Sequence, residues 1–393
     1  MSKEVFILGG KRTPMGEYVG ALKDVSAIEL GAVASRGALQ ATGVRPEEID
    51  HTVFGNALQT SGDAIYGARH VALKAGVPFE RPALTVNRLC GSGIQSIVSG
   101  AHMIRLGEAH TCLVGGMESM SQAPHVIRGA RSGFALGQGK LEDSLMVALL
   151  DTYCNTPMAG TAENLARKFE IPREDQDEYA FRSQQEAKRA LDAGYLAEEI
   201  IAVEVKTRKG TVQVDRDDHL RPDTTLEGLA KLKPAFAKDG FVTAGNASGI
   251  VDGAAALIIA DEEFVKRRDL SPMGRIVGWA YVGVEPEFMG IGPVPATRAV
   301  LEKVGLSLNQ IDLIEVNEAF AAQYLAVEKE LGLDRSRTNV NGGAIALGHP
   351  LGATGTRLIL TVLHELQRRA GRYGLATACI GGGQGIAMVV ERL

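Results

Sequence analysis

Short apolar runs and longer stretches with helical spacing alternate along the chain. Apolar side chains recur three or four residues apart over residues 94–104 and 358–366, as on one face of a helix. Short strand-like runs, most of them bounded by glycine, stand at Val5–Leu8, Thr111–Val114, Ala254–Ile259, Leu313–Val316, Thr377–Ile380 and Ile386–Val390. Strands that alternate with helices predict an α/β fold.

One helix–glycine–strand pattern occurs twice, at a fixed distance. Residues 38–50 and 300–312 both match the end of a helix, a glycine, a short connector and the start of a strand. Gly305 follows Gly43 by 262 residues (305 − 43), and the register continues without a gap beyond the strands. This register predicts two duplicated halves; a chance similarity between two such units is the alternative.

The same offset relates two turns that carry reactive side chains. Cys90 corresponds to Gly352, which lies in the turn that contains His349, and each turn precedes a predicted helix. Two halves related by a pseudo-twofold axis would bring both helix N-termini toward one site. We therefore expect Cys90 and His349 to lie close together.

Residues from about 119 to 250 differ from both halves. They are more polar, with charge runs at 173–178 and 215–218 that we interpret as solvated faces. The region is predicted to be a large insertion into the first half. The expected domains are residues 1–118 with 250–271, the insertion 119–249, and residues 272–393.

Composition limits the classes of function. The chain has 393 residues, and its net charge of −5 argues against nucleic-acid binding. No apolar run approaches the roughly 20 residues that span a bilayer, so membrane insertion is not expected. Four cysteines without a CxxC pair, and a start that resembles neither a signal peptide nor a transit segment, predict a cytoplasmic protein. The mitochondrial matrix is the alternative.

Cys90 and His349 are candidates for nucleophilic chemistry. Most intracellular cysteines are small buried hydrophobes, but Cys90 follows a strand-like run, is flanked by glycine and begins a helix. A helix N-terminus lowers the pKa of a thiol below about 8.5, so we expect a low pKa and a nucleophile. His349 is suited to take the thiol proton, with an ordinary turn histidine before proline as the alternative.

Cys379 and Asn317 also lie at strand ends. The glycines after Cys379 lead into another strand rather than a helix, which argues against a dinucleotide loop and predicts a hairpin with free backbone amides. Such amides stabilise a developing oxyanion, and Cys379 would be an acid/base group beside them. Asn317 is suited to hold a water or to cap a helix, and Glu318 to orient His349 or a neighbouring residue. No HExxH, CxxC or carboxylate–histidine spacing predicts a metal site.

The motifs Cys-Gly-Ser-Gly (90–93), Asn-Glu-Ala-Phe (317–320), Gly-His-Pro (348–350) and Cys-Ile-Gly-Gly-Gly (379–383) occur in this order and spacing. Together they resemble the thiolases over essentially the whole chain, in particular the degradative 3-ketoacyl-CoA thiolases. The resemblance implies two duplicated α/β halves packed as a five-layer α-β-α-β-α core with a large inserted loop domain. It also implies thiolytic cleavage of 3-ketoacyl-CoA, or the reverse Claisen condensation, by a ping-pong mechanism.

The resemblance also assigns roles to residues. Cys90 would carry the acyl group; His349, with a water held by Asn317, would activate it and stabilise one oxyanion. Cys379 would be the second acid/base, and the amides of Cys90 and Gly381 the second oxyanion hole. Substrate and coenzyme A would contact five further residues: Arg221, Thr224, Ser248, Met158 and Phe320. CoA is then a substrate, and no permanently bound cofactor is expected.

Some alternatives stay open. Biosynthetic acetoacetyl-CoA thiolases commonly have histidine where Pro157 stands, so Pro157 and the apolar Met158 favour longer acyl chains. A thiolase that makes acetoacetyl-CoA is the first alternative, and a non-catalytic acyl-CoA-binding relative a distant one. The resemblance further implies a homotetramer, with a dimer as the alternative, and a tetramerising loop near residues 125–140.

Overall fold

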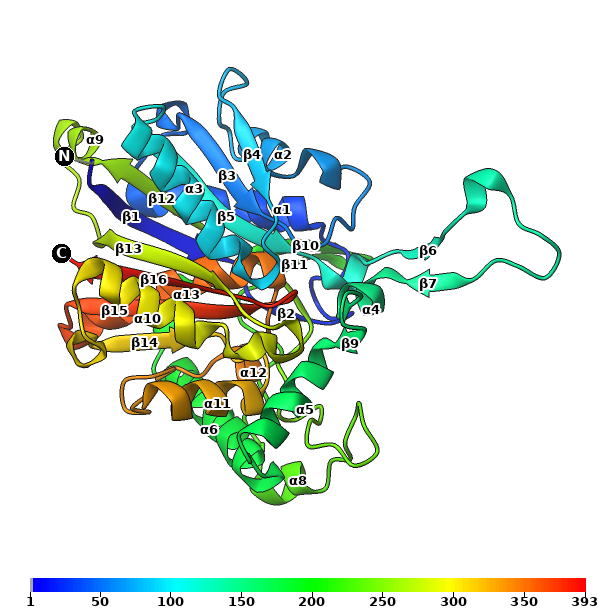
Figure 1. Ribbon diagram of the computed structural model, residues 1–393. Coiled ribbons are helices and arrows are strands. Elements are labelled where there is room, and N and C mark those ends of the chain that lie inside the picture. Colours follow the sequence, from blue (N-terminus) through cyan, green and yellow to red (C-terminus); the bar gives the residue numbers. More distant parts are fainter. Residues whose placement is uncertain (1–2) are drawn as a thin grey trace.

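The strands of both halves lie in one mixed sheet. The computed structural model describes residues 3–393 (Figure 1). The order across the sheet is β4 (Ala83–Val86), β3 (His51–Gly55), β5 (Thr111–Glu118), β12 (Val251–Asp261), β1 (Val5–Arg12), β13 (Gly274–Gly283), β16 (Gln384–Arg392), β15 (Tyr373–Ile380) and β14 (Leu313–Val316), with β2 (Gly16–Glu17) on β12. The halves join through a short antiparallel contact of Phe6 and Ile7 with Arg275 and Gly274.

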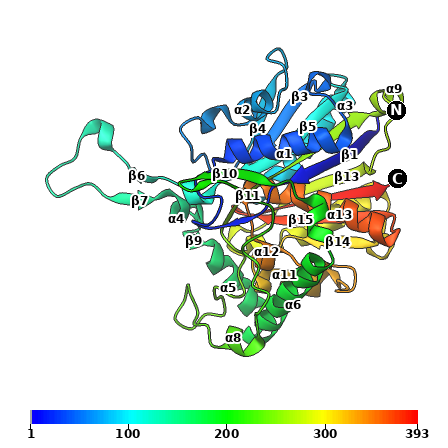
Figure 2. The same cartoon turned by 180° about the vertical axis from the view of Figure 1, so that it is seen from behind.

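Helices form three layers around the two parts of the sheet. The long helices are α1 (Ala27–Thr42), α2 (Gly67–Lys74), α3 (Ser92–Leu106), α10 (Pro293–Val304), α11 (Ala321–Leu331) and α13 (Leu351–Arg369), and the short ones α9 (Glu262–Arg267) and α12 (Ala344–Leu347). α3 and α13 share one apolar core with strands of both halves. α1 and α2 cover the outer face of the first half (Figure 2), and α10 and α11 that of the second. The predicted five-layer α-β-α-β-α arrangement is confirmed.

The duplication is confirmed by its register. β15 begins and ends 262 residues after β5 (373 − 111 and 380 − 118), and the 3₁₀ turns η1 (Pro46–Glu48) and η7 (Leu308–Gln310) keep the same offset. α1 and α10 both end at a glycine in the left-handed region, Gly43 at φ 65° and Gly305 at φ 69°. The repeated glycines are therefore helix stops.

The two central helices touch through matched glycines. A Cβ on Gly93 would lie 2.5 Å from the Thr356 amide nitrogen, and one on Gly355 would lie 2.4 Å from the Ile94 amide nitrogen. Gly355 follows Gly93 by 262 residues (355 − 93). Equivalent residues meet at a twofold axis, so the pseudo-twofold axis passes here, three residues from Cys90.

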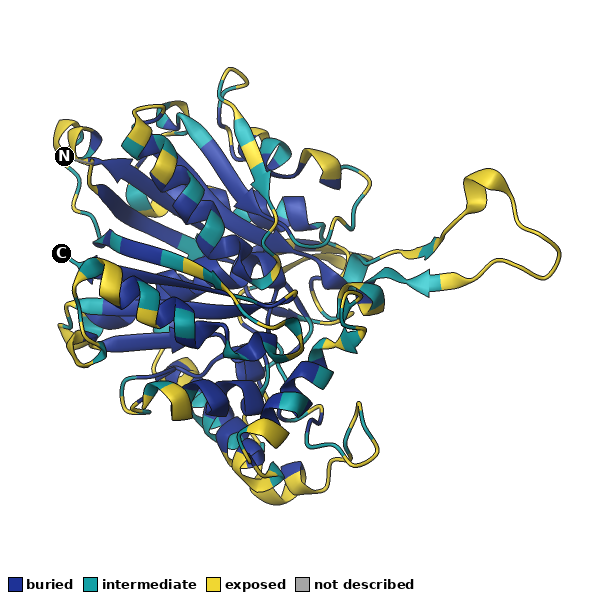
Figure 3. Ribbon diagram, in the orientation of Figure 1, coloured by how far each residue is buried: buried dark blue, intermediate teal, exposed yellow. Residues whose placement is uncertain are grey.

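The segment between the halves contains its own helices and hairpins. The helices are α4 (Ser144–Ala148), α5 (Met158–Lys168), α6 (Arg173–Asp192), α7 (Tyr195–Glu199) and α8 (Leu226–Ala230). The hairpins are β6 (His125–Ile127) with β7 (Leu141–Asp143), β8 (Leu150–Asp151) with β9 (Thr156–Pro157), and β10 (Val203–Thr207) with β11 (Gly210–Val214). The β6–β7 hairpin extends away from the body and is exposed at its tip (Figure 3). The extent of this segment as a domain stays a prediction.

The interpretation of the two charge runs as solvated faces is wrong in part. Asp217 is buried and accepts hydrogen bonds from the fully buried Arg12 guanidinium at 2.7 and 2.9 Å. Asp177 is also buried and binds Arg173 at 2.8 Å. A buried guanidinium without a carboxylate partner would cost several kcal/mol. Each run therefore contains one buried, paired carboxylate, and Asp217 ties the insertion to Arg12 on β1. No helix within residues 3–393 is long and apolar enough to cross a membrane.

Candidate active site

Cys90 is presented on a strained turn. It lies in η3 (Leu89–Gly91), between β4 and α3. Leu89 has φ 46°, a left-handed conformation that costs a non-glycine residue about 1 kcal/mol or more. Ser92 stabilises the turn, since its Oγ accepts from the Arg88 amide at 2.8 Å and donates to the Leu89 carbonyl at 2.7 Å.

The prediction of a low pKa for Cys90 is contradicted. Burial raises the pKa of the Cys90 thiol to about 11, and the negative charge of Glu118 adds to this, although the amides of Gly381 and Cys90 hydrogen-bond the sulfur and act in the opposite direction. Cys90 packs against an apolar cluster that includes Met120 and Leu351. Loss of water around the sulfur therefore outweighs the nearby helix N-terminus, and the resting thiol is neutral.

His349 lies between α12 and α13 and is buried. Its Nδ1 is 2.6 Å from Thr354 Oγ1, and that hydroxyl donates its one hydrogen to the Pro350 carbonyl at 3.1 Å. Nδ1 must then carry the imidazole proton, which leaves Nε2 with its lone pair as an acceptor. Burial, helped by the positive charge of Arg357, lowers the pKa of His349 to about 3. His349 is thus a neutral base, oriented by a threonine that sequence reasoning missed.

Asn317 lies beside this base. Its Nδ2 is 3.4 Å from His349 Nε2, and its backbone amide donates to the Thr377 carbonyl at 2.9 Å, which anchors it to β15. Within residues 3–393 its buried Oδ1 has no hydrogen-bond partner. A buried carbonyl oxygen of this kind calls for a water or a ligand, which agrees with the predicted water site.

Glu318 does not orient His349, which is one of its two predicted roles; it binds other neighbours instead. Its carboxylate accepts from the Tyr179 hydroxyl at 2.6 Å, from Ser183 at 2.7 Å and from the Ile345 amide at 3.1 Å. These partners lie on α6 and α12, so Glu318 fixes the insertion to the second half.

Cys379 is the penultimate residue of β15 and is fully buried. It packs with Met289 and Ala319, and Met158 and Phe320 border the same cluster. Burial raises the pKa of the Cys379 thiol, and the neighbouring Cys90 raises it further. The two thiols are therefore close enough to interact electrostatically, and both are neutral at rest.

The predicted β15–β16 hairpin is present after Cys379. Gly382 and Gly383 make its turn with φ of 79° and 82°. A Cβ on Gly383 would lie 2.3 Å from the Val284 carbonyl oxygen, so glycine is required there. The turn places Gly381 beside Cys90, and both residues line one cavity.

Two adjoining cavities meet at the reactive groups. One, of about 200 Å³, is lined by Cys90, Leu149, Met158, Leu351 and Gly381, among others. The second, of about 220 Å³, shares the side chains of Leu149, Met158 and Leu351 with the first and adds Ser248, Phe320 and His349. Cys90 and His349 therefore face neighbouring cavities with a common wall, as the repeat predicts.

A third and larger cavity, of about 480 Å³, is lined by Arg221 and Thr224. The Arg221 side chain is more than half exposed and forms an ion pair with Glu17, while its amide donates to Gln184 Oε1 at 2.9 Å. Thr224 Oγ1 donates to the Arg221 carbonyl at 2.7 Å. The predicted CoA contacts thus divide: Arg221 and Thr224 line an outer cavity, and Ser248 lines the cavity of His349.

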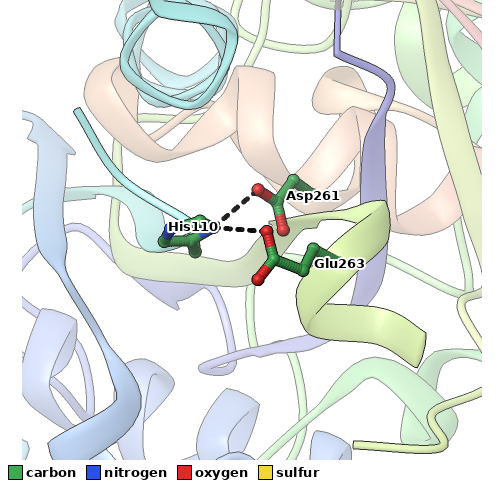
Figure 4. A group of neighbouring side chains, drawn as sticks. All are labelled: His110, Asp261 and Glu263. Carbon is green, nitrogen blue, oxygen red and sulfur yellow. Dashed lines mark hydrogen bonds and ion pairs between the residues drawn. The ribbon is translucent and has the colours of Figure 1, made fainter. Parts of the chain in front are cut away.

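Among the described residues, one group has the ligand atoms for a metal ion, and it lies outside these cavities. Figure 4 shows His110, Asp261 and Glu263 at the end of β12. Asp261 is already occupied: it accepts from Lys3 at 2.9 Å, hydrogen-bonds His110 at 2.8 Å and caps α9 through the Phe264 amide. The lysine ammonium takes the place that a cation would need.

The raised pKa of Cys90 predicts a specific pH dependence of alkylation. The thiolate is the nucleophile, so the rate of Cys90 modification by iodoacetamide should rise with pH up to about pH 11. In urea-unfolded protein the alkylation rate of the same cysteine should level off near pH 8.5 to 9. Subtracting the rate of a Cys90→Ala variant isolates this site. A plateau below pH 8 in the folded protein would contradict the neutral resting thiol.

Comparison with known proteins decides the family. The family models described as "Thiolase, N-terminal domain" and "Thiolase, C-terminal domain" match residues 5–263 and 270–392. The chain belongs to the thiolase family. A human relative, 3-ketoacyl-CoA thiolase, mitochondrial, is 57% identical over 98% of both chains. An acetyl-CoA acetyltransferase of Rhizobium meliloti is 49% identical over 99% of both chains.

A solved structure supports the same assignment. The crystal structure of human mitochondrial 3-ketoacyl-CoA thiolase in complex with CoA matches this thiolase with a TM-score of 0.97 at 56% identity, over 100% of this chain and 98% of that chain. The relatives are acyltransferases, so the prediction of an acyltransferase is confirmed.

The prediction of a cytoplasmic location is contradicted. The human, orangutan and cattle relatives, each 57% identical over 98% of both chains, are named as mitochondrial thiolases. The prediction rested on the cysteine pattern and the first residues, and the match over the full length outweighs both.

Proposed function

We propose that this thiolase uses free CoA to cleave 3-ketoacyl-CoA into acetyl-CoA and an acyl-CoA shortened by two carbons, or runs the reverse condensation. The observation that carries the proposal is that Cys90 and Gly381 line one cavity, which shares a wall with the cavity of His349, and that Cys379 lies two residues before Gly381. A nucleophile, an oxyanion donor and a second proton-transfer group thus meet at one point.

In the first half-reaction the Cys90 sulfur attacks the 3-keto carbon while His349 Nε2 takes the thiol proton. A neutral thiol and a neutral imidazole favour transfer of the proton during the attack, rather than a resting ion pair. The C2–C3 bond then breaks, C2 takes the proton of Cys379, and acetyl-CoA leaves. Acyl-Cys90 and the Cys379 thiolate remain.

In the second half-reaction the Cys379 thiolate takes the proton of an incoming CoA thiol. The CoA sulfur attacks the acyl carbon, the bond to Cys90 breaks, and protonated His349 returns its proton to the Cys90 sulfur. The amides of Cys90 and Gly381, and a water held by Asn317, would stabilise the oxyanions. Neither half-reaction involves an oxidation or a reduction. The cycle therefore needs no resident redox cofactor, and CoA acts as a substrate.

CoA would extend from the reactive centre to the outer cavity. Ser248 lies beside His349 and would contact the pantetheine arm, while Arg221 and Thr224 would bind the nucleotide end. An arginine suits a phosphate because its charge is permanent. The name of the CoA-bound human structure supports this binding.

We propose a homotetramer, with a dimer as the alternative. The β6–β7 hairpin supports it, because its exposed side chains include Ile127, Phe134, Leu136 and Leu141 (Figure 3). Large apolar groups on an extended hairpin favour contact with another subunit.

The acyl chain is proposed to be longer than four carbons. The cavity at Cys90 is lined by apolar Leu89, Leu149 and Met158, and Pro157 borders the adjoining cavity. Each buried methylene contributes about 0.8 kcal/mol, so kcat/KM should rise about tenfold from a four-carbon to a six-carbon substrate. The test is the thiolysis rate against 3-ketoacyl chain length from four to sixteen carbons. A sharp optimum at four carbons would instead favour an acetyl-CoA acetyltransferase, as in the Rhizobium meliloti relative.

A further inference from the structure

Glu118 is a buried carboxylate beside the reactive centre that the mechanism above does not use. It is the last residue of β5 and is 0% exposed. Its Oε1 accepts from the Leu58 amide at 2.8 Å and from Asn56 Nδ2 at 2.9 Å. Its Oε2 accepts from the Gly352 amide at 2.8 Å and from the Ala57 amide at 3.1 Å. Four donors from two halves of the fold therefore converge on one carboxylate.

One side of this network leads to the Cys90 turn. Glu118 holds the amides of Ala57 and Leu58, and the Ala57 carbonyl accepts from Asn87 Nδ2 at 3.2 Å. Asn87 Oδ1 in turn accepts from the Leu89 amide at 2.9 Å. Leu89 is the residue with φ 46° that precedes the nucleophile. A strained residue persists when its surroundings fix it, and this chain of hydrogen bonds does so.

The other side of the network leads to the His349 turn. Gly352 lies three residues after His349, in the first turn of α13. That helix start is pressed against the end of β5, since a Cβ on Gly352 would lie 2.7 Å from the Met117 carbonyl oxygen and one on Gly116 would lie 1.8 Å from the Gly352 oxygen. The Glu118 bond to the Gly352 amide fixes this contact at its end.

We propose that Glu118 is a positioning residue that holds the Cys90 turn and the His349 turn in register for proton transfer between them. The proposal rests on the functions proposed above for Cys90 and His349. Proton transfer needs heavy atoms about 3 Å apart, and a displacement of 1 Å costs about 10²-fold in rate. An ionised carboxylate has acceptor sites for all four donors, whereas an amide would turn an NH₂ group toward two of them.

The two possible roles of Glu118, stabilising the fold and positioning the reactive turns, predict different effects of its replacement on Tm and kcat. If Glu118 only stabilises the fold, its loss lowers Tm but leaves kcat per folded molecule unchanged. If Glu118 acts through His349, its replacement lowers kcat with little effect on the KM values for CoA and for the 3-ketoacyl-CoA. It should also have little further effect once His349 has been replaced.

The experiment is a double-mutant cycle with Glu118→Gln, His349→Asn and both together. We expect Glu118→Gln to lower kcat about 10²-fold, with both KM values within about threefold of wild type. In the His349→Asn background the same change should cost less than about threefold. The matched control is Asp252→Asn, which removes a buried carboxylate that binds Ser121 instead of either turn. It should retain kcat.

The outcomes separate the two proposals. Wild-type protein without thiolysis, or His349→Asn with full activity, would overturn the proposed function. If wild type is active and His349→Asn is strongly impaired but still measurable, then full kcat in Glu118→Gln, or fully additive losses in the double variant, would overturn the positioning role alone. If Glu118→Gln does not fold, Glu118→Asp serves in its place, because it keeps the charge but is too short to reach both turns; full kcat in that variant would overturn the proposal.

Discussion

Cys90→Ala is expected to lower kcat for thiolysis by at least about 10⁴-fold, because the covalent acyl intermediate loses the thiol that carries it. The protein should stay folded, since Cys90 is only partly buried and the Leu89 turn is held by Asn87 and Ser92 rather than by the sulfur. Initial rates with a 3-ketoacyl-CoA, corrected for folded fraction by circular dichroism, measure the effect.

Cys154→Ala is the matched control for this change. Cys154 is another partly buried cysteine, but it lies between β8 and β9 and lines neither cavity at the reactive centre. It should leave kcat within about twofold of wild type. Residual thiolysis above about 1% in purified Cys90→Ala would disprove the nucleophile assignment.

Cys379→Ala should still accept an acyl group on Cys90 but should lose C–C bond cleavage. C–C cleavage needs a proton for C2, and the loss of a general acid–base group costs about 10² to 10⁴-fold. Transfer of an acyl group from acyl-CoA to Cys90 releases a thiolate, a far better leaving group than a carbanion, so acyl-Cys90 should still form. Intact-protein mass spectrometry after incubation with acetyl-CoA should show one added acetyl group.

The acetylated Cys379→Ala variant should then fail to turn over. A Cys90→Ala/Cys379→Ala double variant should gain no acetyl group, which shows that the label is on Cys90. If Cys379→Ala turns over at the wild-type rate, Cys379 is not the second acid/base. If it cannot be acetylated, the proposed division of roles between the two thiols is wrong.

The repeat and the motifs could be predicted from the sequence because each depends on residues that are close together along the chain. Gly43 and Gly305 must adopt left-handed φ, so they mark helix ends at a constant spacing. The strands were harder to delimit: β12 runs from Val251 to Asp261, whereas the pattern indicated residues 254–259. All eleven of its residues are buried, so no alternation of polar and apolar positions marks its ends.

What the sequence could not reveal depends on distant parts of the chain. The pKa of Cys90 is raised by apolar residues far away in sequence, and a local helix signal predicted the opposite. Thr354 orients His349 from the next turn of helix, and a threonine there has no visible signature. Glu118 is separated from its partner Gly352 by 234 residues, so nothing near it in the sequence indicates its four donors.

The contact between Gly93 and Gly355 makes plain what a single chain gains over a pair of identical subunits. An exact homodimer must place the same residue on both sides of its axis. Here the matched positions differ: Cys90 corresponds to Gly352, Cys379 to Met117, and Glu118 to Ile380 at the fixed offset of 262. Fusion of the halves therefore permits one asymmetric centre with a single nucleophile. Strict symmetry would instead place the same residues in both halves, so that no residue could have a role of its own in one half.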